Sequence, residues 1–230
     1  TTFAAVLEAG QSFAFPAVPL EGVSQTLLIQ YLAVGGQLAG EDGQPLLDEG
    51  PLLTVLSFYE EAVAAGLISP ALLDYKTPLD YWDDFLSGGL GLAVVDSTTY
   101  LGSLGQVPNV AAAPTWTASG DSLTTLDGWV WVLTTADPDR QAQAAVFLAW
   151  MMQSDRQQEF TQSFGMLPSR SGEDGAYAQL VETLLSGEQL IVADEVNAAV
   201  ATALQTALMA VISGEESAEA ATAQALAAFQ

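Results

Sequence analysis

Neither cysteine nor histidine occurs among the 230 residues. Without them the chain cannot form a Ser-His-Asp or Cys-His catalytic group, a disulfide, an iron–sulfur cluster or a zinc site of the usual ligand types. Most familiar hydrolase mechanisms are therefore excluded. The lack of cysteine does not indicate a compartment, because cytosolic and bacterial secreted proteins can both lack disulfides.

Basic residues are almost as scarce. Lys and Arg number 4 against 28 Asp and Glu, which gives a formal net charge of -24. The four cations are Lys76, Arg140, Arg156 and Arg170. Such a chain is repelled by nucleic acid and by anionic membrane surfaces, so we expect neither as a partner. The acidity is compatible with secretion, and it reflects depleted Lys and Arg more than salt adaptation.

Long hydrophobic runs are also missing. The best run, residues 144–152, is much shorter than the roughly 18 apolar residues of a transmembrane helix. The first residues lack the basic region of a signal peptide, so we expect a processed or cut end there.

The chain nevertheless has the composition of a globular protein. Half of its residues are hydrophobic, and Gly and Pro stay near ordinary usage. Its length allows one large α/β domain or two small lobes.

Hydrophobic periodicity predicts alternating helices and strands. The expected helices cover 3–9, 23–33, 51–65, 78–86, 140–153, 155–163, 195–212 and 217–229. The expected strands cover 13–15, 90–95, 110–113 and 128–134.

The run 90–95 is continuously apolar, which favours a buried central strand. Asp96, Ser97, Thr98 and Tyr100 follow directly after it. Open α/β sheets bind ligands beyond the carboxyl ends of their strands, so these side chains are candidate ligand-binding residues.

Aromatic residues near expected loops could stack on the apolar faces of sugars. Those residues are Tyr100, Trp116, Trp129 and Trp131. Strand alternation places Trp129 and Trp131 on one face, and for Trp131 the core interpretation is favoured. Trp82 and Trp150 lie within helical patterns and are interpreted as packing residues.

Paired carboxylates could serve a glycosidase, but a structural role is favoured for each group. Adjacent residues on a helix do not face each other, which argues against the doublets 60–61 and 83–84. The acidic loop 41–49 does not meet the EF-hand pattern and is interpreted as solvated loop. The sequence thus predicts no catalytic residue, no metal ligand and no cofactor.

Short motifs in a fixed order resemble the bacterial extracellular solute-binding proteins of family 1, the sugar-type binding components of ABC importers. The segment 85–95 resembles the family's F-x-x-G-x-x-A-M strand entry, and 165–170 (G-M-L-P-S-R) resembles its G-x-L-P-x-R. The other similar segments are 110–114, 127–129, 140–152, 154–158 and 212–221.

The resemblance implies an α/β, periplasmic-binding-protein-like (type II) lobe with a mixed sheet flanked by helices, together with part of a second lobe. Residues 1–126 would form most of the carboxy-terminal lobe. Residues 127–175 would belong to the amino-terminal lobe and hinge crossing, and 176–230 would return to the carboxy-terminal lobe. The usual amino-terminal part of the family is absent from this sequence.

The resemblance also implies a function and a site. The chain would bind a sugar, oligosaccharide or polyol between two lobes, as a monomer outside the cytoplasm, lipid-anchored in its full-length form, and deliver the ligand to the permease subunits of an ABC importer. The ligand-facing residues would be Asp96, Ser97, Thr98, Tyr100, Asp127, Gly128, Trp129 and Arg170.

Two other functions remain open. A non-binding extracellular adaptor of the same fold would explain the missing lobe, because closure of a cleft needs two walls. A secreted carbohydrate-active enzyme would need two carboxylates at a fixed separation, and nothing in the sequence requires such a pair.

Overall fold

The structure is a computed structural model that describes residues 1–20, 22–106, 110–125, 130–167, 169, 188–190 and 196–229. Its helices are α1 (Phe3–Ala9), α2 (Gln25–Ala33), α3 (Glu49–Ala64), α4 (Trp82–Leu86), α5 (Ser97–Gly102), α6 (Pro138–Met151), α7 (Ser154–Phe164), α9 (Ala198–Ser213) and α10 (Ala218–Ala227). Short 3-10 helices are η1 (Pro70–Asp74), η2 (Pro78–Asp80) and η3 (Leu104–Gln106). The strands are β1 (Phe13–Ala14), β2 (Leu92–Ala93), β3 (Leu123–Thr125) and β4 (Glu188–Leu190).

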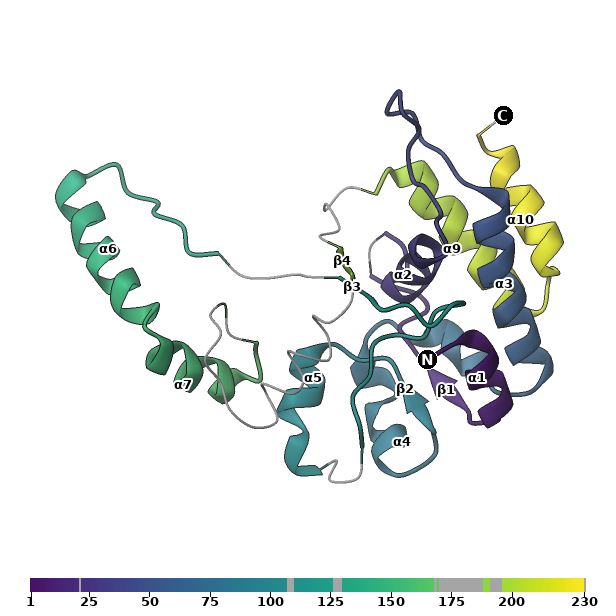
Figure 1. Ribbon diagram of the computed structural model, residues 1–230, viewed down its shortest axis with the longest axis horizontal. Coiled ribbons are helices and arrows are strands. Elements are labelled where there is room, and N and C mark those ends of the chain that lie inside the picture. Colours follow the sequence, from purple (N-terminus) through teal and green to yellow (C-terminus); the bar gives the residue numbers. More distant parts are fainter. Residues whose placement is uncertain are drawn as a thin grey trace.

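Two pairs of parallel strands are described. Phe13 and Ala14 of β1 pair with Leu92 and Ala93 of β2, and β3 pairs with β4. Parallel strands need a long crossover, and here the chain between β1 and β2 supplies α2, α3 and α4 (Figure 1).

One hydrophobic core joins α1, α2, α3, α9 and α10 to β1. The Phe3 ring of α1 stacks on Phe58 of α3 with centroids 4.2 Å apart. Phe13 of β1 lies 5.8 Å from the same ring. These contacts bury the apolar faces that the helical periodicity predicted. The aromatic side chains with less than 2% exposure are Phe13, Phe15, Tyr31, Tyr59 and Tyr81.

A buried polar network links α2, α3 and the segment after residue 110. The Tyr59 hydroxyl donates to Gln30 Oε1 at 2.6 Å, and Gln30 Nε2 donates to the Trp116 carbonyl at 3.3 Å. Burial raises the pKa of Tyr59 above its ordinary range, so the hydroxyl keeps its proton and remains a donor. The network gives a hydrogen-bond partner to both the oxygen and the nitrogen of the Gln30 side-chain amide, which is fully buried.

Helix α9 is tied to the loop between β1 and α2 by one side chain. Gln205 Nε2 donates to the Ala17 carbonyl at 2.6 Å, and its Oε1 accepts from the Ser24 N–H at 3.0 Å. Through this contact a helix from the end of the chain satisfies backbone groups near its start.

Three expected strands are not observed as predicted. Residues 110–113 form no strand, and β2 covers only 92–93 and is half-buried. Within the described residues β2 pairs only with β1, so the apolar run 90–95 lies at a sheet edge and not at its centre. Residues 130–134 of the third expected strand pair with no described strand, and residues 128 and 129 lie outside the described part.

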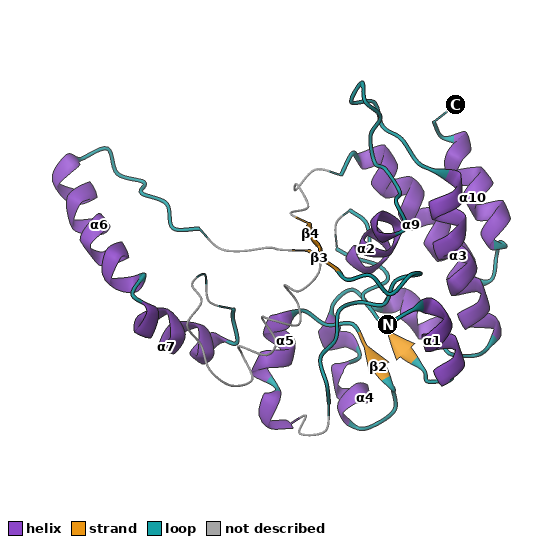
Figure 2. Ribbon diagram, in the orientation of Figure 1, coloured by secondary structure: helices purple, strands orange, loops and turns teal. Residues whose placement is uncertain are grey.

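The described part of 130–167 differs from the rest in its burial. Helix α6 has no buried residue, and it lies well away from the core helices (Figure 2). Trp131 and Trp150, both expected to pack, are exposed, whereas Trp82 is buried as predicted. No helix within the described ranges is long and apolar enough to cross a membrane.

The Gln30 network yields a stability prediction. Tyr59→Phe leaves the buried Gln30 Oε1 without its donor, so we expect unfolding free energy to fall by about 1–3 kcal/mol. Tyr75→Phe is the matched control, since the Tyr75 hydroxyl has no hydrogen bond to a described residue and should change stability by less than about 0.5 kcal/mol. Urea unfolding of both variants tests this, and equal losses would contradict it.

Candidate functional site

The candidate site begins where β2 ends. The Val94 N–H donates to the Ala14 carbonyl at 2.9 Å, which extends the contact with β1 by one residue. On the other side, the hydroxyl of buried Tyr81 donates to the Val94 carbonyl. The strand end is therefore held from two directions before the chain turns into α5.

Asp96 determines how α5 starts. Its Oδ1 accepts from the Thr99 N–H at 2.7 Å, and its Oδ2 accepts from the Thr99 hydroxyl at 2.9 Å. This is an N-cap, in which a side-chain carboxylate satisfies a backbone donor that the first helical turn leaves free. Asp96 thus positions the residues after it, while a carboxylate still has lone pairs for a ligand hydroxyl.

Three predicted residues project from α5 after this cap. Ser97 and Tyr100 are half-buried and Thr98 is exposed. No described residue forms a hydrogen bond with their side chains. The structure thus groups two unused hydroxyls and one aromatic ring carrying a third hydroxyl on a single short helix.

The underside of α5 is firmly packed. Leu101 is buried, and Trp82 Nε1 of α4 donates to Ser103 Oγ at 3.0 Å, just after the helix ends. The Trp82 ring also stacks on Phe85 at 5.0 Å. One hydrogen bond from α4 thus holds the carboxyl end of α5.

The electrostatic environment of the site is negative. Burial raises the pKa of Tyr81 above its ordinary range, and the nearby carboxylates of Asp96 and Asp80 raise it further. The Thr77 and Lys76 N–H groups donate to Asp80 and lower the pKa of that carboxyl, so it stays ionised. The Asp96 carboxylate at the start of α5 therefore disfavours an anionic ligand there.

Helix α7 approaches α5 at Gly165. A Cβ added at this residue would lie 3.0 Å from the Thr98 carbonyl oxygen and 3.1 Å from the Gly102 nitrogen. Gly165 also has a φ of 65°, which side chains rarely adopt. Only glycine fits this contact between α7 and the backbone of the candidate site.

The other predicted site residues are not brought into this group. Asp127, Gly128, Trp129 and Arg170 lie outside the described residues. Trp116, a candidate for sugar stacking, is a core residue instead, with its ring edge-on to Phe13 at 5.2 Å. The position of Trp116 after an apolar segment is compatible with an exposed loop residue or with a buried core residue, and the sequence pattern alone does not distinguish the two.

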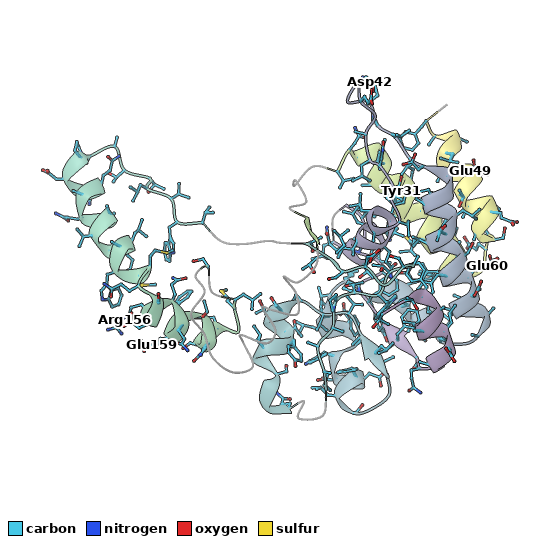
Figure 3. All side chains as sticks on the ribbon, viewed as in Figure 1. Tyr31, Asp42, Glu49, Glu60, Arg156 and Glu159 are labelled. Atoms are coloured by element: carbon cyan, nitrogen blue, oxygen red, sulfur yellow. The ribbon has the colours of Figure 1, made fainter. Side chains whose placement is uncertain are left out.

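The acidic groups have structural uses. Glu60 Oε2 accepts from the Ala218 N–H at the start of α10, and Asp48 Oδ2 accepts from the Gln37 N–H at 2.7 Å. Asp42 Oδ1 accepts from the Gln44 N–H within its own loop. Figure 3 places Asp42 and Glu60 at separate points on the α3 side of the fold. In the described ranges no three acidic residues gather closely enough to hold a metal ion.

Sequence reasoning missed two residues that support the site, Tyr81 and Gly165. Tyr81 lies between η2 and α4, in a segment predicted simply as one helix. Gly165 was part of a recognised motif, but its close contact depends on packing between distant segments. A groove of about 520 Å³ between α9 and α10 is lined mainly by alanine and threonine and does not include α5.

Comparison with solved structures shows the same fold in sugar-binding proteins. Maltose-bound MalE3 of T. maritima has a TM-score of 0.70 at 16% identity, with 99% of this chain and 64% of that chain covered. A solute-binding protein from Thermotoga lettingae with bound α-D-tagatose has a TM-score of 0.70 at 18% identity, with 98% of this chain and 62% of that chain covered. The GacH receptor of Streptomyces glaucescens, solved in complex with acarbose, has a TM-score of 0.66 at 17% identity, with 99% of this chain and 63% of that chain covered.

The chain thus spans less than two thirds of the length of these solved neighbours. They establish a periplasmic-binding-protein-like fold of type II, in agreement with the sequence-based expectation. No curated protein matches the chain. The family model for bacterial extracellular solute-binding proteins matches residues 3–182, so the chain belongs to that family.

Proposed function

We propose that this chain forms the carboxy-terminal wall of a binding site for a neutral sugar, oligosaccharide or polyol. The supporting observation is the surface of α5, where the hydroxyls of Ser97, Thr98 and Tyr100 form no hydrogen bond with a described residue and follow directly after the Asp96 carboxylate. Sugars combine apolar faces with many hydroxyls, so a site of this composition suits them. Asp96 would add an acceptor while keeping its capping role.

The division of the chain is part of the proposal. Residues 1–126 and 176–230 would make the carboxy-terminal lobe, and 127–175 would cross into the amino-terminal lobe. The packing of α9 and α10 against α3 supports the return of the chain to the first lobe. Asp127, Gly128, Trp129 and Arg170 would face the ligand from the crossing segments.

The mechanism would be reversible binding coupled to lobe closure. A ligand that contacts both lobes stabilises the closed form, because only that form offers both sets of contacts. The closed protein would then deliver the ligand to ABC permease subunits. It would work as an extracytoplasmic monomer, held at the membrane by a lipid anchor on the full-length protein.

Two other functions make different predictions. A carbohydrate-active enzyme needs two carboxylates across a cleft, whereas Asp42, Asp48 and Glu60 are engaged in backbone contacts. An adaptor of the same fold would bind no small molecule. Solute binding without turnover therefore separates the proposed function from both.

The first prediction from the proposed function concerns ligand-dependent stability of the natural chain that contains these residues. We expect maltose, tagatose or a related polyol to raise its melting temperature, since a ligand at 100 times its Kd stabilises by about 2.7 kcal/mol. Thermal melts should be paired with chromatography of the sugar. Conversion of the sugar would support the enzyme, and no shift with any neutral sugar or polyol would support the adaptor.

The second prediction assigns binding to α5. Tyr100→Ala removes the ring and should raise the Kd of the sugar identified in those melts about tenfold. Thr98→Ala removes one hydroxyl and should raise it about fivefold. Thr202→Ala, an exposed threonine on α9, is the matched control and should leave binding unchanged. Calorimetry that finds Thr98→Ala and Thr202→Ala equivalent would argue against α5 as the site.

The third prediction tests the support of α5 by α7. Gly165→Ala and Gly10→Ala both place a side chain at a φ near 60°, but only residue 165 has backbone atoms within reach of the new Cβ. We expect amide hydrogen exchange across 97–102 to accelerate in Gly165→Ala alone. Equal exchange rates of the 97–102 amides in the two variants would mean that the contact at Gly165 does not hold α5 in place.

A further inference from the structure

The parallel ladder between β1 and β2 stops at a proline. The Val94 N–H donates to the Ala14 carbonyl at 2.9 Å, which continues the register in which Ala14 faces Ala93. In a parallel ladder, the carbonyl of such a residue accepts from the N–H two positions further along the partner strand. That position is Pro16, which has no N–H group. The backbone of β1 therefore cannot supply the next hydrogen bond to the Val94 carbonyl.

The Tyr81 hydroxyl supplies the hydrogen bond that β1 cannot. It donates to the Val94 carbonyl from a side chain that is 1% exposed. Burial raises the pKa of this hydroxyl above its ordinary range, so it keeps the proton that it donates. A backbone carbonyl left without a partner inside a fold is costly, and here a side chain takes the part of a strand.

Tyr81 is itself fixed by its surroundings. Its N–H donates to the Pro78 carbonyl at 3.3 Å, and its carbonyl accepts from the Phe85 N–H at 3.0 Å. Its ring lies 5.3 Å from that of Tyr75, whose carbonyl accepts from the Val18 N–H in the loop after β1. A donor held in this way has little freedom to follow a displaced strand, so it can determine where the end of β2 lies.

The position of this strand end matters because the other end of the same segment is also held. Trp82, the next residue after Tyr81, donates from its Nε1 to Ser103 Oγ at 3.0 Å, just after α5 ends. Tyr81 fixes the backbone two residues before Asp96, where α5 is capped. Two adjacent residues thus hold α5 from its two ends.

We propose that Tyr81 is a positioning residue of the candidate site, and that its hydroxyl replaces the backbone donor missing at Pro16. Tyr81 is too deeply buried to contact a ligand. It acts by fixing the strand end from which Asp96 and α5 emerge, so that the side chains proposed to bind sugar are already in place when the ligand arrives. The inference rests on the proposed function and names a residue that sets the affinity of the site without touching the ligand.

Tyr31 provides a matched comparison for this role. Its hydroxyl is also buried and donates to a backbone carbonyl, that of Gln37, at 2.8 Å. This contact lies between α2 and the loop that precedes α3, and it involves no residue of α5. Loss of either tyrosine hydroxyl should lower the melting temperature, but only the loss at Tyr81 should weaken ligand binding.

Tyr81→Phe and Tyr31→Phe, made in the natural chain that contains these residues, test the proposal by calorimetry. The probe is maltose or tagatose, whichever raises the melting temperature of the unmodified protein. We expect Tyr81→Phe to raise its Kd about tenfold and Tyr31→Phe to change it less than about twofold. Equal Kd values in the two variants would overturn the proposal, because the role of Tyr81 would then be one of stability alone.

The missing donor allows a rescue experiment. Pro16→Ala introduces an N–H at the ladder position and keeps the carbonyl that accepts from Ser24. In the Tyr81→Phe background it should return the Kd to within about threefold of the original value, and alone it should leave the Kd unchanged. A double variant that binds no better than Tyr81→Phe would contradict the replacement of a ladder bond by Tyr81.

Amide hydrogen exchange without ligand separates this proposal from the proposed function. We expect the 95–102 amides to exchange at least about tenfold faster in Tyr81→Phe than in Tyr31→Phe. Faster exchange in a protein that binds no neutral sugar would refute the function and support the positioning of α5 by Tyr81. Equal exchange in the two variants would overturn that positioning, whatever the sugar binds.

Discussion

The parallel pairing of β1 with β2 is the constraint on which the described fold depends. Two residues from near the start of the chain lie beside two from its middle, so everything between them must form a crossover. That crossover places α3 against β1, and α9 and α10 then pack on α3 (Figure 1). The same pairing sets the direction of the strand end from which Asp96 and α5 emerge. The positions of the candidate site and of the core helices thus both follow from the two-residue pairing of β1 with β2.

The scarcity of cations gives the carboxylates an unusual part in the structure. With so few Lys and Arg available, several carboxylates accept from backbone N–H groups, as Asp96 does from Thr99 and Asp137 does at α6. The only described ion pairs join Arg156 to Asp155 and Glu159, and all three side chains are substantially exposed. Figure 3 shows Arg156 and Glu159 close together. Such pairs contribute little stability. Order at the helix ends therefore depends on capping more than on charge pairing.

Sequence periodicity predicted elements whose partners lie within the chain. The helix expected at 51–65 is α3, observed at 49–64, because its apolar face meets β1, α9 and α10. The same reasoning misjudged Trp131 and Trp150. An apolar pattern shows that a segment is suited to burial, but it does not show whether another segment packs over it. In the candidate site, the position of Asp96 after a strand was predictable, whereas the roles of Tyr81 and Gly165 arise from contacts across the fold.

The contact at Gly165 also bears on which parts of α5 can change. The α7 end meets the main chain of α5 at the Thr98 carbonyl and the Gly102 nitrogen, so this contact does not depend on the side chain at residue 98. Thr98 is exposed, and its side chain can be exchanged without loss of that backbone contact, whereas Ser97 and Tyr100 are half-buried. A contact made through the backbone lets a surface residue vary while the helix that carries it keeps its place.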